Sequence, residues 1–290
     1  MKIRFWILFL GGILFLFFTG AAGSDDTNIP EWLKRTSYGL KLENDQKLKY
    51  FFETVQPLWE AKDGEKVIFN QSRISLRDDR PTYNIGFGLR KLVSEDILLG
   101  GNIFYDYQDL HKHSRLGLGG EYLTPVLEAR VNTYWRIVNA RIVSENNSEK
   151  TIEKVANGFD GELGGPVPFF KILSVYGGGY WFHFDHFKNK YGWKVRSELK
   201  PYDFTRLTFE LYNDTKRGGM GYSLEGAVNL NFTSFAWKDI LADLREHKRI
   251  YAKADLKDKM LDRVVRDFDI TVVTTKENKT TGLTVEAGRN

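Results

Sequence analysis

The stretch Arg115-Leu-Gly-Leu-Gly-Gly-Glu-Tyr122 has two different sides if it forms a β-strand, because successive side chains of a strand point in opposite directions. The side that carries Arg115 and Glu121 is polar, with glycine at its other two positions. The opposite side is apolar and ends in an aromatic ring. In a soluble sandwich the apolar side would pack on a second sheet, whereas in an outer-membrane barrel it would contact lipid and the polar side would line a wet lumen.

The composition of the chain restricts this choice. A mean hydropathy of −0.40 over 290 residues excludes a bundle of membrane helices but not a barrel, because half of each barrel strand is polar. The formal charge of +4 includes two basic residues near the start, so the remaining chain is nearly balanced and we expect no nucleic-acid partner. The absence of cysteine excludes disulfides, thiol nucleophiles and thiolate metal sites.

The first residues have the pattern of a secretory signal peptide. Met1-Lys-Ile-Arg4 is basic, residues 5–18 are apolar, and residues 19–24 are mostly small. We expect residues 1–23 to be removed on export, because two aspartates follow the small residues at once. A short periplasmic segment, residues 24–36, then precedes the first strand.

Residues 37–233 show repeated strand patterns separated by turn signals. The connections alternate between short turns and longer loops, as in bacterial barrels. A periplasmic N-terminus places the long polar loop of residues 138–156 outside the cell. The expected strands are residues 38–43, 49–58, 67–76, 82–93, 97–108, 115–123, 126–137, 158–165, 174–184, 191–200, 206–213 and 219–232.

The polar sides of these strands carry full charges in their middles. An unpaired charge in a dry core would cost several kcal/mol, whereas a hydrated lumen with both signs imposes no such cost. The expected lumen-facing residues are Arg90, Asn102, Arg115, Gly117, Gly119, Glu121, Glu128, Arg130, Lys194, Arg196 and Glu225.

Aromatic residues near the strand ends are typical of the belts that outer-membrane barrels place at the lipid interfaces. These residues are Tyr83, Tyr105, Tyr107, Tyr122, Trp135, Trp181, Trp193 and Tyr222. The sequence therefore indicates an all-β fold, and it favours a membrane barrel over a soluble β protein. It predicts a transmembrane antiparallel barrel of about twelve strands, held by lipid in the bacterial outer membrane.

The apolar spacing changes after residue 233. Apolar residues among Lys, Arg, Asp and Glu fall near the helical period, which predicts a helical linker over residues 234–268. Its charges exclude a membrane span. The tail, residues 269–290, begins with a β-like segment, residues 270–274.

Several motifs, in sequence order, resemble the intimin/invasin family of inverse autotransporters. The glycine-rich strand of residues 115–122 is similar to the family's signature strand. The others are Gln56-Pro-Leu-Trp59, Asn84-Ile-Gly-Phe-Gly88 with Arg90, Leu99-Gly-Gly-Asn-Ile-Phe-Tyr-Asp106, Val131-Asn-Thr-Tyr134, Ala156-Asn-Gly-Phe-Asp160 and Val264-Val-Arg-Asp-Phe-Asp-Ile270. The similarity covers residues 37–273.

The resemblance implies a twelve-stranded translocator whose linker returns through the pore and displays a passenger outside. It places Leu261, Val264, Val265 and Arg266 in the pore linker. Residues 226–232 resemble the terminal-strand signal read by the barrel assembly machinery, and periplasmic chaperones are expected partners as well.

This sequence departs from the family pattern at three places. It ends at Asn290, so we expect little or no passenger of its own and consider a separately encoded one. Residues 24–36 are too short for the peptidoglycan-binding module that often precedes the barrel, although peptidoglycan is still considered as a partner. Asp267-Phe268-Asp269 replaces the family's asparagine pair.

Other functions remain as alternatives. A porin-like or structural barrel would hold residues 236–266 as a plug in its lumen or in the periplasm. An outer-membrane hydrolase would need a serine beside a histidine, and Ser114 follows His113 only as a neighbour in a loop. We therefore expect no enzyme, no catalytic residue and no cofactor.

The histidines give a weak metal signal. His183 and His186 would point to opposite faces of a strand, which favours the start of a polar loop. His111 and His113 share a parity, but a solvated loop explains them better than a metal site. We expect no metal.

Overall fold

The computed structural model describes residues 30–201, 204–229, 255–282 and 284–286. The expected signal peptide, residues 1–23, lies outside these ranges, as does most of the expected linker helix. Among the described residues, no helix has the length and apolar character needed to cross a membrane.

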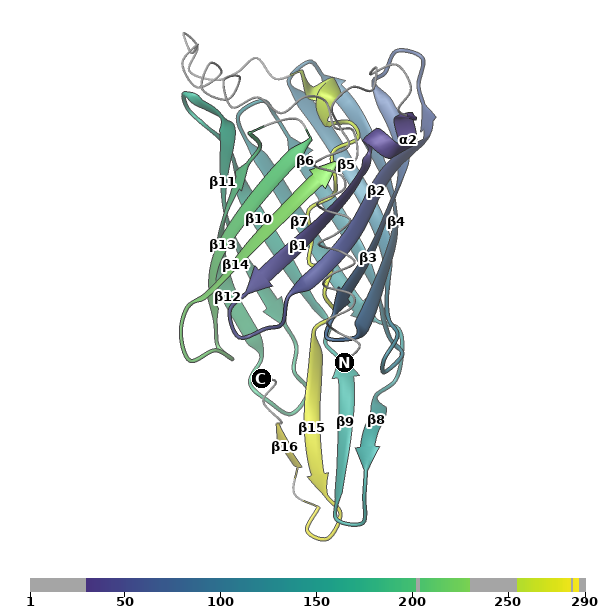
Figure 1. Cartoon of the computed structure of the whole chain (residues 1–290), viewed down its shortest axis with the longest axis vertical. Helices are drawn as coiled ribbons and strands as arrows, with labels where there is room; N and C mark the ends of the chain where they lie inside the picture. The colour runs from purple at the N-terminus through teal and green to yellow at the C-terminus, as the bar shows by residue number, and fades with distance from the viewer. Residues whose placement is uncertain (1–29, 202–203, 230–254, 283, 287–290) are drawn as a thin grey trace, which may run out of the picture.

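Within the described residues, twelve antiparallel strands close into a barrel (Figure 1), which confirms the predicted fold class and strand number. A short helix, α2 (Glu31–Lys34), precedes the first strand. The strands follow the chain around the barrel, and the first pairs with the last. They are β1 (Thr36–Glu43), β2 (Lys49–Glu60), β3 (Lys66–Arg77), β4 (Arg80–Ser94), β5 (Ile97–Gln108), β6 (His113–Leu123), β7 (Glu128–Arg136), β10 (Gly158–Val167), β11 (Phe170–Phe182), β12 (Lys190–Leu199), β13 (Thr205–Asp214) and β14 (Gly221–Asn229).

The two sides of each strand separate as the alternation predicts. In β4, Ile85, Phe87 and Leu89 are exposed on the outer surface, whereas Asn84 and Arg90 are buried inside the barrel. In β6, Leu118 and Tyr122 are exposed while Arg115 and Glu121 are buried. The outside is therefore an apolar surface suited to lipid, and the inside is polar and charged.

The lengths of the connections indicate which end of the barrel is extracellular. At one end the turns are short, such as those between β4 and β5 and between β10 and β11. At the other end, residues 137–157 form the longest described connection. Because bacterial barrels turn tightly in the periplasm and loop more widely outside, this end is the extracellular one.

The long connection contains secondary structure that the sequence did not predict. Residues 138–156 were expected to be a polar loop, but β8 (Arg141–Glu145) and β9 (Glu149–Val155) form a hairpin within them. This hairpin continues into a second sheet of order β16-β15-β9-β8, with β15 (Val272–Asn278) and β16 (Thr284–Glu286). We call this sheet the extracellular sheet; Figure 1 shows it beyond the barrel rim.

The conformation of this hairpin depends on its pairing with β15. Strand β9 has little apolar character of its own and is held by pairing with β15 from Val272↔Val155 to Asn278↔Glu149. A contact that distant in sequence leaves no local signal. At the tip, Glu145 accepts a hydrogen bond from Lys279 at 2.8 Å, which lowers the pKa of the Glu145 carboxyl.

Residues 255–271 lie inside the barrel, and we call them the threaded segment. The prediction of a helical linker is wrong for them: a 3₁₀ turn, Leu256–Lys259, is followed by extended chain. The expected helix over residues 236–254 lies outside the described residues. Val264, Arg266, Phe268 and Ile270 are buried while the residues between them are partly exposed, which is the period of two of an extended chain.

Candidate functional site

The threaded segment runs along the barrel axis from the periplasmic end to β15 (Figure 1). At its entry, Lys257 donates to the carbonyl of Asp63 in the β2–β3 turn at 3.0 Å. At its exit it continues into the extracellular sheet. An extended chain advances about 3.3 Å per residue, so the roughly ten residues after the turn span about 33 Å, enough to cross the membrane once.

Arg90 holds the entry of the threaded segment. Its Nε and Nη2 bind the carboxylate of Glu121 at 2.8 and 3.1 Å, and its Nη1 donates to the carbonyls of Lys259, Met260 and Asp262 at 3.2, 3.2 and 2.5 Å. Both residues are buried, at 1% and 6% exposure. The ion pair thus compensates the charge, and the guanidinium binds the carbonyls at the end of the 3₁₀ turn, of which that of Lys259 also accepts from the Asp262 amide.

Amide side chains of the wall hold the middle of the threaded segment. Gln71 accepts a hydrogen bond from the Val264 amide at 2.7 Å and lies 3.5 Å from its carbonyl. Asn132 donates to the carbonyl of Val265 at 3.1 Å, and Asn84 to that of Phe268 at 3.1 Å. These contacts explain the absence of helix, because the wall supplies the hydrogen bonds that a helix would make internally.

Asp106 is the centre of the polar contacts. Its carboxylate accepts hydrogen bonds from Asn84, Arg115 and Arg266, each at 2.7 Å. Arg266 belongs to the threaded segment, and Arg115 also donates to the carbonyl of Asp267 at 2.5 Å. Asp106 and Arg115 are 0% exposed. One buried carboxylate therefore binds a guanidinium of the wall, Arg115, and a guanidinium of the threaded segment, Arg266.

Apolar side chains of the threaded segment pack against the inner wall. Leu256, Met260, Val264 and Phe268 join one buried cluster with wall residues from five strands. The wall residues are Val55, Val67, Phe69, Leu92, Leu98, Phe104 and Leu123. The lumen is thus filled by protein at this level rather than being a fully wet channel, which corrects the expectation drawn from the charges alone.

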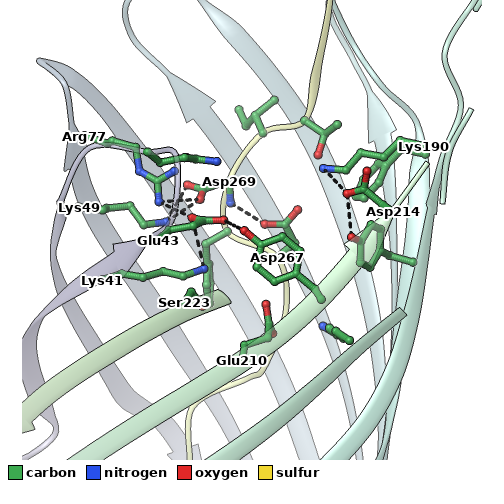
Figure 2. Close-up of a pocket in the computed structure, with 18 of the residues that line it drawn as sticks. Lys41, Glu43, Lys49, Arg77, Lys190, Glu210, Asp214, Ser223, Asp267 and Asp269 are labelled. Carbon is green, nitrogen blue, oxygen red and sulfur yellow. Dashed lines mark hydrogen bonds and ion pairs between the residues drawn. The ribbon is translucent and has the colours of Figure 1, made fainter. Parts of the chain in front are cut away.

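The exit of the lumen is wider and more polar. Asp269 binds Lys49 at 2.7 and 2.8 Å and lies 3.8 Å from Arg77, as Figure 2 shows. Around this point a cavity of about 1720 Å³ opens beside the threaded segment. Within the Asp267-Phe268-Asp269 stretch that replaces the family's asparagine pair, Asp269 has basic wall partners, and the Asp267 carboxylate accepts from the Asp269 backbone amide at 3.0 Å.

The other expected lumen-facing residues form ion pairs within a strand, between strands and with the threaded segment. Arg196 binds Glu162 at 2.6 and 3.0 Å, and Arg130 binds Glu162 at 3.1 Å. Glu128 pairs with Arg130 at 2.5 Å and with Lys259 of the threaded segment, and Glu225 lies 3.9 Å from Arg263. Lys194 lies 4.0 Å from Asp160. These pairs compensate the charges on the inner wall formed by β7, β10, β12 and β14.

The two glycines of the opening stretch differ in what they face. A Cβ at Gly117 would lie 2.6 Å from Nη2 of Arg266, in the threaded segment. A Cβ at Gly119 would instead lie 2.6 Å from the side chains of Asn102 and Asn132 in the wall. Gly117 therefore leaves room for Arg266 of the threaded segment. Gly119 leaves room for Asn132, which binds the carbonyl of Val265 in that segment.

Of the expected linker residues, Val264 and Arg266 are buried inside the barrel, Leu261 packs on the apolar cluster and Val265 is bound through its carbonyl. Sequence reasoning did not assign Gln71, Asn84, Asp106 or Tyr134 to the site. Three of them stand in the motifs that carry the family resemblance, which is the signal that could have found them. Gln71 has no such signal.

The histidines and Ser114 do not form a hydrolase site. His113 and Ser114 are consecutive on β6 and so belong to opposite sides of the strand. The His113 imidazole contacts Glu153 instead. His183 and His186 lie exposed in the β11–β12 loop, as predicted.

The comparison with protein families identifies this architecture. The family model of the inverse autotransporter β-domain matches residues 26–267, which include the whole barrel and most of the threaded segment. The chain belongs to the inverse autotransporter family. It is accordingly a β-barrel of the bacterial outer membrane, as the sequence predicted.

Named relatives agree with this membership. An Escherichia coli K12 protein, named as a homolog of the attaching and effacing protein, is 32% identical over 166 residues, which are 55% of this chain and 54% of that protein. Intimin of Escherichia coli O111:H- is 34% identical over 114 residues, which are 39% of this chain and 12% of intimin. The inverse autotransporter adhesin YeeJ of Escherichia coli K12 is 31% identical over 134 residues, 45% of this chain and 6% of YeeJ.

A solved structure has a similar fold. A membrane-protein structure from work on in-meso crystallization superposes with a TM-score of 0.65 and 20% sequence identity, covering 82% of this chain and 99% of that chain. The chain spans about half the length of the first relative and a much smaller share of intimin and YeeJ.

Proposed function

We propose that this barrel anchors the chain in the outer membrane and exports the segment that follows it through its own lumen. The observation that carries the proposal is the pairing of β15 with β9 at the extracellular end. The threaded segment enters at the periplasmic end, so β15 is the first part of the chain beyond the lumen. Strand β9 then gives the emerging chain a ready partner for its backbone hydrogen bonds.

The contacts inside the lumen also favour passage of an extended chain. Arg90, Gln71 and Asn132 bind backbone atoms of the threaded segment rather than its side chains. Backbone groups recur at every residue, so such a wall holds an extended chain with little regard to its sequence. A wall of this kind fits a pore that lets other sequences pass before the final segment comes to rest.

The test uses a protease recognition sequence inserted between Thr281 and Gly282, in the turn that leads from β15 to β16. Gly282 is exposed and has a φ of +69°, as expected for a turn. Protease added to intact cells should cleave this site, because the turn lies outside the membrane. Cleavage is measured as loss of the full-length chain on a gel.

The matched control carries the same insertion between Asp63 and Gly64, in the β2–β3 turn at the periplasmic end, where Gly64 has a φ of +70°. Its site should be cleaved only after the outer membrane is opened. Protection of the first site in intact cells, with an equal amount of folded barrel, would contradict export.

A further inference from the structure

We propose that His111, His113 and Glu153 form a binding site for a divalent transition-metal ion, with Zn²⁺ as the representative. The three come from different elements: His111 from the β5–β6 turn, His113 from the first position of β6, and Glu153 from β9. One ligand atom from each lies within 4.8 Å of the others. The site would join the barrel rim to the extracellular sheet.

The geometry is close to that of a bound ion. Glu153 Oε2 lies 2.7 Å from His111 Nδ1 and 2.7 Å from His113 Nε2, so one carboxylate oxygen stands between the two imidazoles. The rings are nearly perpendicular, with centroids 5.8 Å apart. With Zn–N and Zn–O bonds of about 2.0–2.1 Å, ligand atoms of a tetrahedral zinc are about 3.3 Å apart. Lengthening the two contacts of Glu153 with His111 and His113 by roughly 0.6 Å each would therefore give the separations of zinc ligands.

The donor set selects the class of metal. Two imidazole nitrogens and one carboxylate oxygen suit Zn²⁺, Ni²⁺ and Cu²⁺, whereas Ca²⁺ and Mg²⁺ prefer oxygen ligands alone. Water would complete the tetrahedral shell, because the chain supplies three ligands. His113 is 0% exposed and Glu153 is 6% exposed, while the His111 side chain is 24% exposed. Two ligands are thus fixed by packing, and the third gives access from solvent.

The position of the site gives metal binding a structural consequence. Glu153 stands opposite Thr274 in the pairing of β9 with β15. A metal bound to Glu153 and to both histidines would tie β9, the partner of the emerging strand, to β6 of the barrel. No ligand belongs to the threaded segment or to β15, so loss of metal binding with surface cleavage at the Thr281–Gly282 site retained would contradict this proposal and leave the proposed export intact.

The test measures Zn²⁺ binding to the full-length chain, purified in detergent with an affinity tag that contains no histidine. Isothermal titration is expected to show one Zn²⁺ per chain, undisturbed by excess Ca²⁺ or Mg²⁺. Glu153→Gln and His111→Gln should each weaken binding at least about 100-fold, since even loss of a group that only orients a ligand costs up to that factor.

The matched control is the double variant His183→Gln/His186→Gln, which removes two exposed histidines from the next large loop and should leave binding unchanged. His111 lies in a turn, so its replacement tests the site without altering the interior, and heat-modifiable gel migration verifies folding. Absence of stoichiometric binding, or binding that survives both single changes, would overturn the proposal. Loss of binding in the control would assign the metal to another loop.

Discussion

Replacement of Asp106 by alanine is expected to destabilise the folded barrel by about 3–5 kcal/mol, the usual cost of removing one partner of a buried ion pair. Asp106 accepts hydrogen bonds from Asn84, Arg115 and Arg266. The variant leaves two buried guanidinium groups without this carboxylate, and the cost falls on the wall and on the threaded segment together. We therefore expect weaker retention of the segment as well as a less stable barrel.

The measurement is the temperature at which the folded band converts to the unfolded band on a gel. Asp109→Ala is the matched control, because Asp109 lies three positions along the chain in the exposed β5–β6 turn and pairs with Lys112 at 2.8 Å. An exposed pair contributes about 0–1 kcal/mol, so the control should convert at nearly the parental temperature. Equal temperatures for both variants would show that Asp106 does not organise the lumen.

Replacement of Gly117 by tryptophan is expected to block passage of the threaded segment while the barrel still inserts. A Cβ at Gly117 already approaches Arg266 to 2.6 Å, so an indole would occupy the path of the segment. Overpacking costs about 1–3 kcal/mol, which corresponds to a roughly 5- to 150-fold loss of the correctly threaded state. Surface cleavage at the Thr281–Gly282 site reports threading, and heat-modifiable migration reports insertion.

Gly120→Trp is the matched control for this change. Gly120 belongs to the same strand but to its outer side, where a Cβ would meet Val131 at an ordinary 3.7 Å. It should preserve both threading and insertion. Gly119→Trp should act indirectly, by displacing Asn132 from the carbonyl of Val265. If Gly117→Trp reduces insertion and threading equally, the glycine serves the barrel fold alone.

The barrel was predictable from sequence because its signal is local. In β4 and β6 the alternation of side chains gives the face of every residue, and charges such as Arg90 and Glu121 face inward as expected. The strand number and the outer-membrane location followed from that alternation and from the order of the motifs. Neither required knowledge of a distant contact.

The threaded segment was mispredicted because its conformation is set by the wall. Val264, Arg266, Phe268 and Ile270 alternate with period two, but the apolar residues before them, set among charged ones, have helical spacing and dominated the assignment. Likewise, β9 is a strand because β15 pairs with it across more than a hundred residues of chain. Tertiary hydrogen bonds override local propensity in both cases.

The most direct measurement of the central claim is a disulfide between the emerging strand and the barrel's own hairpin. Thr275 of β15 stands opposite Ile152 of β9. Directly opposed residues of antiparallel strands have Cα atoms about 4.5–5.5 Å apart, which suits a disulfide. The chain has no cysteine, so the pair Thr275→Cys and Ile152→Cys would be the only thiols.

If the segment threads the lumen and docks on β9, this pair should form a disulfide on intact cells, seen as a mobility shift that reductant reverses. The control pair Thr275→Cys and Lys150→Cys is displaced by two residues along β9 and should remain reduced. Absence of the disulfide in the opposed pair, or equal cross-linking in both pairs, would contradict the threaded arrangement.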